Sequence, residues 1–159
     1  MSLHITTSVV ESQELMEVEW LMIADAAEVL GNKLYVIGGG WNRLSVPSFP
    51  VTKQLGIALA FNCPWSETNE KHQFEIEIAT DDAQTLKKAS GQLEVGRAPG
   101  IVQGSDQRVQ IAANVTIEFK EPGNYLVISR LDGEDKRRVV FQVVGGAANL
   151  APPPAPASP

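Results

Sequence analysis

An unbroken alternation over eleven positions, from Val109 to Phe119, constrains the fold of this chain more than any other feature of the sequence. Apolar side chains occupy every second position, and polar or small residues stand between them. Successive side chains of a β-strand point to opposite faces, so this pattern predicts a strand with one face in a core and the other in water. The apolar positions are Val109, Ile111, Ala113, Val115, Ile117 and Phe119.

The same period of two recurs in other segments. It marks strands over residues 55–61, over 73–78 and over 137–144, and residues 91–97 form a shorter strand with Leu93 and Val95 pointing inward. Pro122-Gly123 suits a turn that reverses the chain into a strand over 125–131. Asp132-Gly133 suits a tight hairpin turn into the strand that follows.

Residues 12–31 are ambiguous, because Leu15, Val18, Met22, Ala26 and Val29 recur at helical spacing. However, residues 30–33 form a turn that leads at once into the strand 33–37, and that strand needs a partner. We therefore predict a strand over 19–29, paired with 33–37 as a hairpin.

About eight strands joined by turns, with no long helical segment between them, predict an all-β fold. The expected architecture is an antiparallel β-sandwich, with a partly open β-barrel as the alternative. The expected organisation is a flexible N-terminal arm over 1–16, one domain over 17–146 and a disordered tail rich in proline and alanine over 147–159. The long loops, where function is expected, are 38–50, 62–71 and 98–104.

The charge of the chain limits its partners. Nineteen acidic and thirteen basic residues give a formal charge of -6, which repels the phosphates of nucleic acid and of anionic membranes. The short basic clusters, 87–88 and 136–138, are interpreted as solvated charges of turns and strand edges. We therefore expect neither nucleic acid nor a membrane as partner. The single cysteine and the absence of a secretory signal pattern favour the cytoplasm.

The residue types that carry catalysis or bind metals are present without the usual spacing. Cys63, Glu67, His72 and Asp81 lack a CxxC or HxxxH arrangement, so we expect no bound metal and no other cofactor. The acidic turns 81–82 and 132–135 do not match a calcium loop, and turn formation explains both. No Ser-His-Asp or Cys-His set is visible, since only two histidines exist.

Four short motifs resemble a family of small bacterial domains of unknown function. They are KLY followed by GGGW (33–41), WxExN (65–69), GRxPG (96–100) and PGxY (122–125). The resemblance spans residues 20–144 and implies a compact β-sandwich and a bacterial source. It implies no activity, substrate, cofactor or partner. The turn 81–84, Asp-Asp-Ala-Gln, departs from the acidic turn ending in glycine that such sequences tend to have.

The function predicted from these observations is a non-catalytic binding or accessory module that acts through its inter-strand loops, with a protein as the partner class. The expected binding residues are Trp41, Trp65, Glu67, His72 and Arg97, because tryptophan and arginine dominate binding hot spots. The competing interpretation of Trp41 and Trp65 is that both cap the hydrophobic core. The alternative functions are a metal-assisted enzyme centred on His72 and Glu67, and a structural assembly protein; the oligomeric state stays open.

Overall fold

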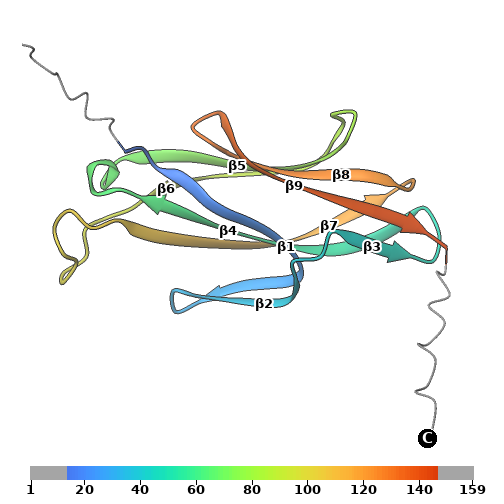
Figure 1. The fold of residues 1–159 in the computed structure, drawn as a ribbon, viewed down its shortest axis with the longest axis horizontal. Helices are drawn as coiled ribbons and strands as arrows, with labels where there is room; N and C mark the ends of the chain where they lie inside the picture. Colours follow the sequence, from blue (N-terminus) through green and yellow to red (C-terminus); the bar gives the residue numbers. More distant parts are fainter. Residues whose placement is uncertain (1–13, 147–159) are drawn as a thin grey trace, which may run out of the picture.

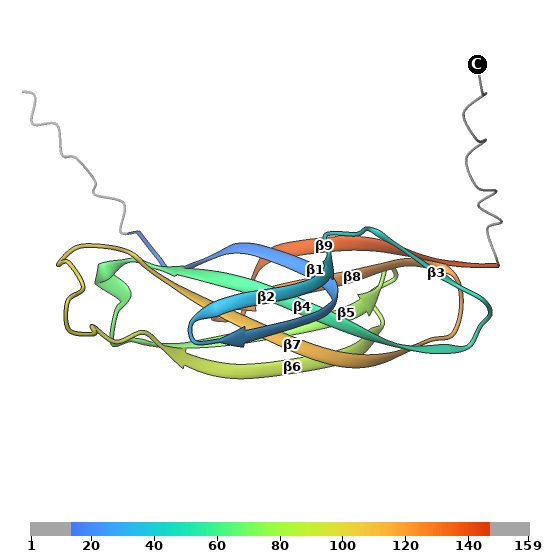
Figure 2. The same cartoon turned by 90° about the horizontal axis from the view of Figure 1, so that it is seen from below.

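Two facing β-sheets make up the part of the chain, residues 14–146, that the computed structural model describes (Figures 1 and 2). One sheet has four strands in the order β2-β1-β4-β7, and the other has five in the order β3-β9-β8-β5-β6. The strands are β1 (Glu17–Leu30), β2 (Lys33–Gly39), β3 (Arg43–Val46), β4 (Val51–Cys63), β5 (Lys71–Thr80), β6 (Thr85–Glu94), β7 (Gln107–Phe119), β8 (Gly123–Leu131) and β9 (Glu134–Gly145), with a 3-10 turn, η1 (Trp65–Glu67), after β4.

This arrangement confirms the predicted all-β sandwich, with nine strands rather than about eight. Neighbouring strands are antiparallel except β3 and β9, which run parallel. Within residues 14–146 the sheets form no closed barrel. No helix in this part of the chain is long and apolar enough to cross a membrane.

The core lies between the sheets and is built from the alternating positions. In β4, Leu55, Ile57, Leu59 and Phe61 are almost completely buried. Aromatic rings fill the other end of the core, where Phe119 meets Tyr125 edge-on at 4.8 Å and Phe141 at 6.1 Å between ring centroids. Tyr125 and Phe141 stack at 5.8 Å, and the Tyr125 hydroxyl donates a hydrogen bond of 2.6 Å to the Glu121 carbonyl. The period of two therefore identified the side chains of β4 that face the core, although Ala58 and Ala60 on its other face are buried as well.

Both predicted tight hairpin turns are present. Gly31 and Asn32 have φ values of 54° and 62°, and Asp132 and Gly133 have 50° and 83°. Two successive residues with positive φ give the turn twist that matches two antiparallel strands. The predicted strand 19–29 is likewise confirmed within β1, so the tertiary pairing outweighs its helical spacing.

Two strand boundaries differ from the prediction. The segment 38–50 was expected to be a loop, yet Arg43–Val46 forms β3 along β9. The strand expected over 91–97 instead covers 85–94 as β6, and Arg97 lies beyond it. Both strands lie at sheet edges, where most side chains face water and the sequence carries no alternation.

The predicted arm and tail fall mostly outside the described residues, which exclude 1–13 and 147–159. Met16, which the prediction placed in the arm, is only 2% exposed and belongs to the core.

The β1–β2 hairpin bends away from the sandwich. Residues 17–24 of β1 pair with β4, and residues 24–30 pair with β2 instead. Gly56 of β4 makes the bend possible, because a Cβ there would lie 2.7 Å from the Ala26 carbonyl carbon. The side chain of Asn114 on β7 then holds the hairpin: its Oδ1 accepts from the Ala27 amide at 3.0 Å, and its Nδ2 donates to the Ala27 carbonyl at 2.9 Å.

Candidate functional site

An aromatic and guanidinium pair lies at the end of the sandwich where β4 leads into η1. The guanidinium carbon of Arg97 stands 4.1 Å from the centre of the Trp65 ring, a cation–π contact. Arg97 Nε donates to Thr68 Oγ1 at 2.6 Å, and Nη2 donates to the Trp65 carbonyl at 3.2 Å. These three contacts hold the exposed arginine in one orientation.

The local fold explains why these residues meet. Pro64 precedes η1, and Thr68 ends it by donating its hydroxyl to the Trp65 carbonyl at 2.7 Å. The amide of Asn69 then donates to the Val95 carbonyl at 2.8 Å, which ties this loop to the chain just before Arg97. Figure 1 shows both loops together at the same end of the sandwich, η1 in green and the 96–106 segment in olive.

His72 lies close by, but inside the protein. It is 5% exposed, and its Nδ1 is 2.8 Å from Asp132 Oδ2. Asp132 Oδ1 also accepts the Gln73 amide at 2.9 Å. Burial raises the pKa of Asp132, but the hydrogen bonds from His72 and from the Gln73 amide outweigh it and hold that pKa below its usual value. The predicted turn-forming aspartate therefore also anchors the imidazole.

Glu67 approaches the other side of the imidazole. Its Oε2 lies 3.3 Å from His72 Nε2, within ion-pair range. The two groups are not aligned for a hydrogen bond, and Nε2 has no hydrogen-bond partner among the described residues. Among residues 14–146, no group of three histidine, cysteine, aspartate or glutamate side chains is placed to hold a metal ion.

Cys63, the other residue considered as a metal ligand, is buried beneath this end of the sandwich. Burial raises the pKa of its thiol, and the negative charges of Glu67 and Asp106 raise it further. A buried thiol with a raised pKa is a poor nucleophile and a poor ligand, so it acts as a packing residue.

Trp41 does not join this group. Its ring meets Phe141 edge-on at 5.8 Å and packs against the core, and its Nε1 donates to Asp25 Oδ1 at 3.2 Å. The segment that carries it, between β2 and β3, lies away from η1 in both views (Figures 1 and 2). Four of the five predicted binding residues therefore gather at one end, and Trp41 caps the core elsewhere.

A hollow of about 590 Å³ lies next to η1, with Pro64, the residue before Trp65, in its lining. The Ser66 hydroxyl donates to the Glu14 carbonyl at 3.3 Å, which places the start of the described chain beside η1. Four carboxylates and a single guanidinium line the hollow, so its charge is mainly negative. Its lining residues are Glu14, Leu15, Glu17, Glu19, Asn62, Pro64, Asp106 and Arg137.

The guanidinium of Arg137 in this hollow also joins the two sheets. Its Nε donates to the Val18 carbonyl at 3.1 Å and its Nη2 to the Glu19 carbonyl at 3.2 Å. The carboxylate of Glu19 binds Arg108, whose hydrogen bond holds the pKa of Glu19 below its usual value. This edge of the hollow is therefore preformed.

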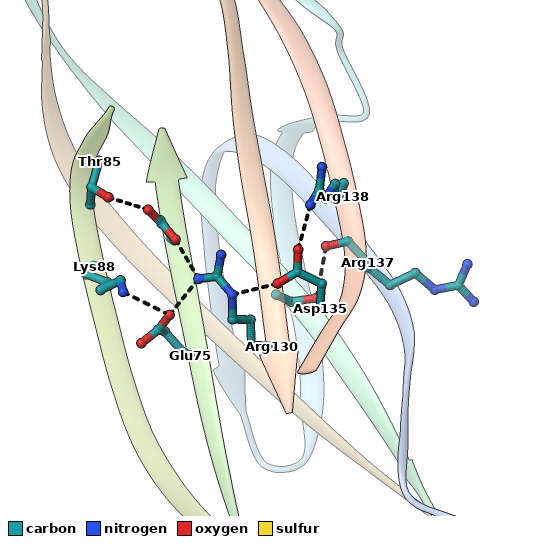
Figure 3. A network of polar contacts seen from close by, with 9 residues as sticks. Glu75, Thr85, Lys88, Arg130, Asp135, Arg137 and Arg138 are labelled. Atoms are coloured by element: carbon teal, nitrogen blue, oxygen red, sulfur yellow. Dashed lines mark hydrogen bonds and ion pairs between the residues drawn. The ribbon is translucent and has the colours of Figure 1, made fainter. Parts of the chain in front are cut away.

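A second polar cluster, which no sequence pattern indicated, lies on the outer face of the five-stranded sheet. Arg130 of β8 binds Glu75 and Glu77 of β5 and Asp135 of β9, with Arg130–Glu75 and Arg130–Asp135 distances of 2.6 Å (Figure 3). Lys88 and Thr85 of β6 and Arg138 of β9 complete it. The hydrogen bond from Thr85, foremost, and that from Arg130 lower the pKa of Glu77. The hydrogen bond from Arg130 likewise lowers the pKa of Glu75. These carboxylates stay ionised, and the cluster ties four strands together.

The alternation over residues 73–78 predicts that Glu75 and Glu77 face water, opposite Phe74, Ile76 and Ile78. Glu77 is instead 7% exposed, because Arg130 and its partners cover it. Alternation reveals the face of a strand, but it does not reveal which charged residues from distant strands will meet on that face.

Comparison with known proteins assigns the chain to a family. Residues 19–144 match a family described as being of unknown function, DUF6941. No curated protein matches the chain. One similar solved structure is the alkylpurine DNA glycosylase AlkC of Pseudomonas fluorescens, bound to DNA containing an abasic site analog. The alignment has 11% identity and a TM-score of 0.43 and covers 80% of this chain but 30% of the glycosylase, so it assigns no activity here. The family match spans most of the chain and nearly the whole sandwich, and the chain belongs to DUF6941.

Proposed function

We propose that this domain is a non-catalytic protein-binding module, and that its contact surface is the end of the sandwich formed by Trp65, Arg97 and the acidic hollow beside them. The observation that carries this proposal is the Trp65–Arg97 pair. Trp65 is half-buried yet is not one of the core side chains of the described structure, whereas Trp41 packs on that core.

The geometry of Arg97 suits recognition. Its hydrogen bonds use Nε and Nη2, and within residues 14–146 no protein acceptor meets Nη1. An orientated guanidinium loses little side-chain freedom on binding, and an indole adds a large apolar contact area. The pair therefore offers a preorganised anchor.

The groups that could perform acid–base or nucleophilic chemistry here are less accessible. The imidazole of His72 is buried. The thiol of Cys63 is buried as well, and its pKa is raised. This pattern favours binding over catalysis at this end. The alternatives, a metal-assisted enzyme at His72 and Glu67 and a structural assembly protein, stay predictions.

The charge of the hollow indicates the kind of protein that fits. Four carboxylates face one guanidinium there, and the chain as a whole carries a formal charge of -6. A basic segment of the partner complements this surface. Electrostatic attraction draws the two together, and added salt shortens the distance over which that attraction acts. The backbone carbonyls or carboxylates of the same partner supply the acceptor for Arg97.

The test compares two loss-of-contact variants with a matched control. The immobilised domain captures proteins from an extract of its source cells, and the affinity of each purified candidate is then measured for the parent, Trp65→Ala, Arg97→Ala and Arg138→Ala. Loss of a hot-spot side chain costs about 2 kcal/mol or more, which is roughly thirtyfold in affinity. Arg138 is an exposed arginine on the outer face of the five-stranded sheet, so its variant should bind like the parent.

The result is decisive in either direction. A protein whose affinity falls roughly thirtyfold with Trp65→Ala and Arg97→Ala, and also falls with added salt, supports the proposal. Candidates that bind both variants as tightly as the parent domain, or that respond equally to Arg138→Ala, overturn it.

A further inference from the structure

The outer edge of strand β2 takes part neither in the packing of the described sandwich nor in the proposed function. Among the described strands, β2 ends the four-stranded sheet and pairs with β1 alone. In Figure 1 it lies outermost below the sandwich, and in Figure 2, seen from below, it lies in front of β4. Its outer edge therefore faces away from the rest of the described structure.

The hairpin turn decides which backbone groups point outward. Leu30 and Lys33 flank a two-residue turn, and such flanking residues exchange hydrogen bonds. Because this bonding alternates along the ladder, Lys33, Tyr35 and Ile37 bond to β1. The amide and carbonyl of Leu34 and of Val36 then point away from β1.

The opposite edge of the hairpin confirms this alternation. Ala27 is the partner of Val36, and its own amide and carbonyl turn away from β2 to the Asn114 side chain. The Asn114 side chain thus satisfies the outward amide and carbonyl of β1, as a neighbouring strand would. Val36 presents the equivalent groups at the edge of β2, where the part of the chain described by the structure supplies no such partner.

Exposed apolar side chains gather on the same hairpin. Leu30, Tyr35 and Ile37 are 54%, 53% and 70% exposed, and they share one face of the hairpin by their pairing. They are half of the six large apolar side chains that are prominently exposed in residues 14–146. An exposed, largely apolar edge strand, here with Lys33 at its first position as its one charge, is a template for another strand.

The other sheet edges are less suited to pairing. Strand β3 has four residues, and β6 carries Lys87 and Lys88, which oppose strand addition. Strand β7 turns its apolar side chains, such as Val109 and Val115, toward the core.

We propose that two copies of this chain associate through β2, as antiparallel neighbours about a two-fold axis at Tyr35. In this register Leu34 of each copy lies opposite Val36 of the other, so their outward amides and carbonyls form four hydrogen bonds. The two Tyr35 rings meet at a non-hydrogen-bonded position, where cross-strand side chains are closest. The β1–β2 hairpins then form one continuous four-stranded ribbon.

The charges agree with a second copy as the occupant. Residues 26–37 carry only Glu28 and Lys33 and are neutral overall, although the chain is strongly acidic. Lys33 lies opposite Ile37 of the second copy, so no like charges face each other. The two Glu28 residues are three strand spacings apart, about 14 Å, which exceeds the Debye length of about 8 Å at physiological salt.

The test combines sedimentation velocity with directed cross-linking of the full chain. We expect a concentration-dependent dimer, which Tyr35→Lys weakens about tenfold or more because it places two like charges opposite each other. Val140→Lys is the matched control, since Val140 is 55% exposed on β9 and far from this edge in sequence and sheet. Tyr35→Cys should form a disulfide-linked dimer under mild oxidation, because opposite Cα atoms at such a position lie within disulfide range.

The native Cys63 is buried, so it should not form disulfides between copies of the chain. Val140→Cys serves as the control for the cross-linking experiment. Thermal melting checks that each variant is folded. A dimer that Tyr35→Lys weakens and Tyr35→Cys traps supports the proposal. A chain that stays monomeric at all concentrations without cross-linking, or a dimer that responds equally to the Val140 variants, overturns it.

Discussion

Replacing Arg130 by methionine tests whether the cluster in Figure 3 stabilises the fold. Methionine retains the apolar stem of arginine but removes the guanidinium that binds Glu75, Glu77 and Asp135. Glu77 is 7% exposed, so it is left as a buried carboxylate with Thr85 as its remaining partner in the cluster. Breaking a fully buried ion pair costs about 3–5 kcal/mol.

The expected cost is lower here, because the side chain of Arg130 is 22% exposed and water can reach the site that it leaves. We expect Arg130→Met to lower the free energy of unfolding by about 2–3 kcal/mol at pH 7. Arg138→Met is the control, since this arginine is 58% exposed and binds only Asp135 in the cluster. A surface pair of this kind contributes about 0–1 kcal/mol.

The dependence on pH identifies the cause. The pKa values of Glu75, Glu77 and Asp135 are lowered in the folded protein, so their contribution is fully present above their unfolded pKa values of about 4. This contribution to stability is lost as the pH falls through the lower pKa values of the folded protein. The gap in stability between parent and Arg130→Met should therefore be largest at pH 7 and should shrink below pH 4.

Urea unfolding, followed by circular dichroism at pH 7 and at pH 3, measures this gap. A gap of the same size at both pH values would show that Arg130 acts through packing rather than charge. A cost of Arg138→Met as large as that of Arg130→Met would also refute the reasoning.

Three further predictions concern the core, the hairpin and the thiol. Trp41→Ala should cost about 3 kcal/mol of stability because the ring packs on Phe141, whereas Trp65→Ala should cost under about 1 kcal/mol; thermal or urea unfolding distinguishes them. Asn114→Ala should speed hydrogen exchange of the Ala27 amide about tenfold or more, as followed by NMR, because the acceptor of that amide is lost; unchanged exchange would contradict the role given to Asn114. Cys63 should resist a thiol reagent in the folded protein and react after unfolding, since it is buried and its pKa is raised; fast labelling of the native state would contradict its packing role.

Local rules were sufficient for most of the fold. The alternation in β4 and β7 predicted which side chains point into the core, because successive side chains of a strand point to opposite faces in any context. The Gly31-Asn32 and Asp132-Gly133 pairs predicted two hairpin turns, since glycine and its polar neighbours adopt positive φ at low cost. These features depend on neighbours in sequence, and the sequence displays them directly.

The candidate site was predictable only in its residue types. Trp65 and Arg97 were singled out for their chemistry, but they meet because the loops 62–71 and 97–106 share one end of the sandwich. Trp41 carries the same side chain and lies against the core instead. The sequence cannot distinguish the two tryptophans, because burial depends on which strands become neighbours.

The sequence by itself determined the strand character of the chain, its turns, its buried faces and its acidic charge, because each follows from residue type and short-range spacing. The tertiary structure alone decided the parallel pairing of β3 with β9, the bend of β1 over Gly56, the enclosure of Glu77 by Arg130 and the anchoring of His72 by Asp132. Each of these contacts joins residues at least several tens of positions apart, and such contacts depend on the order of strands in the two sheets. That order reflects the packing of the whole core, which no local pattern encodes.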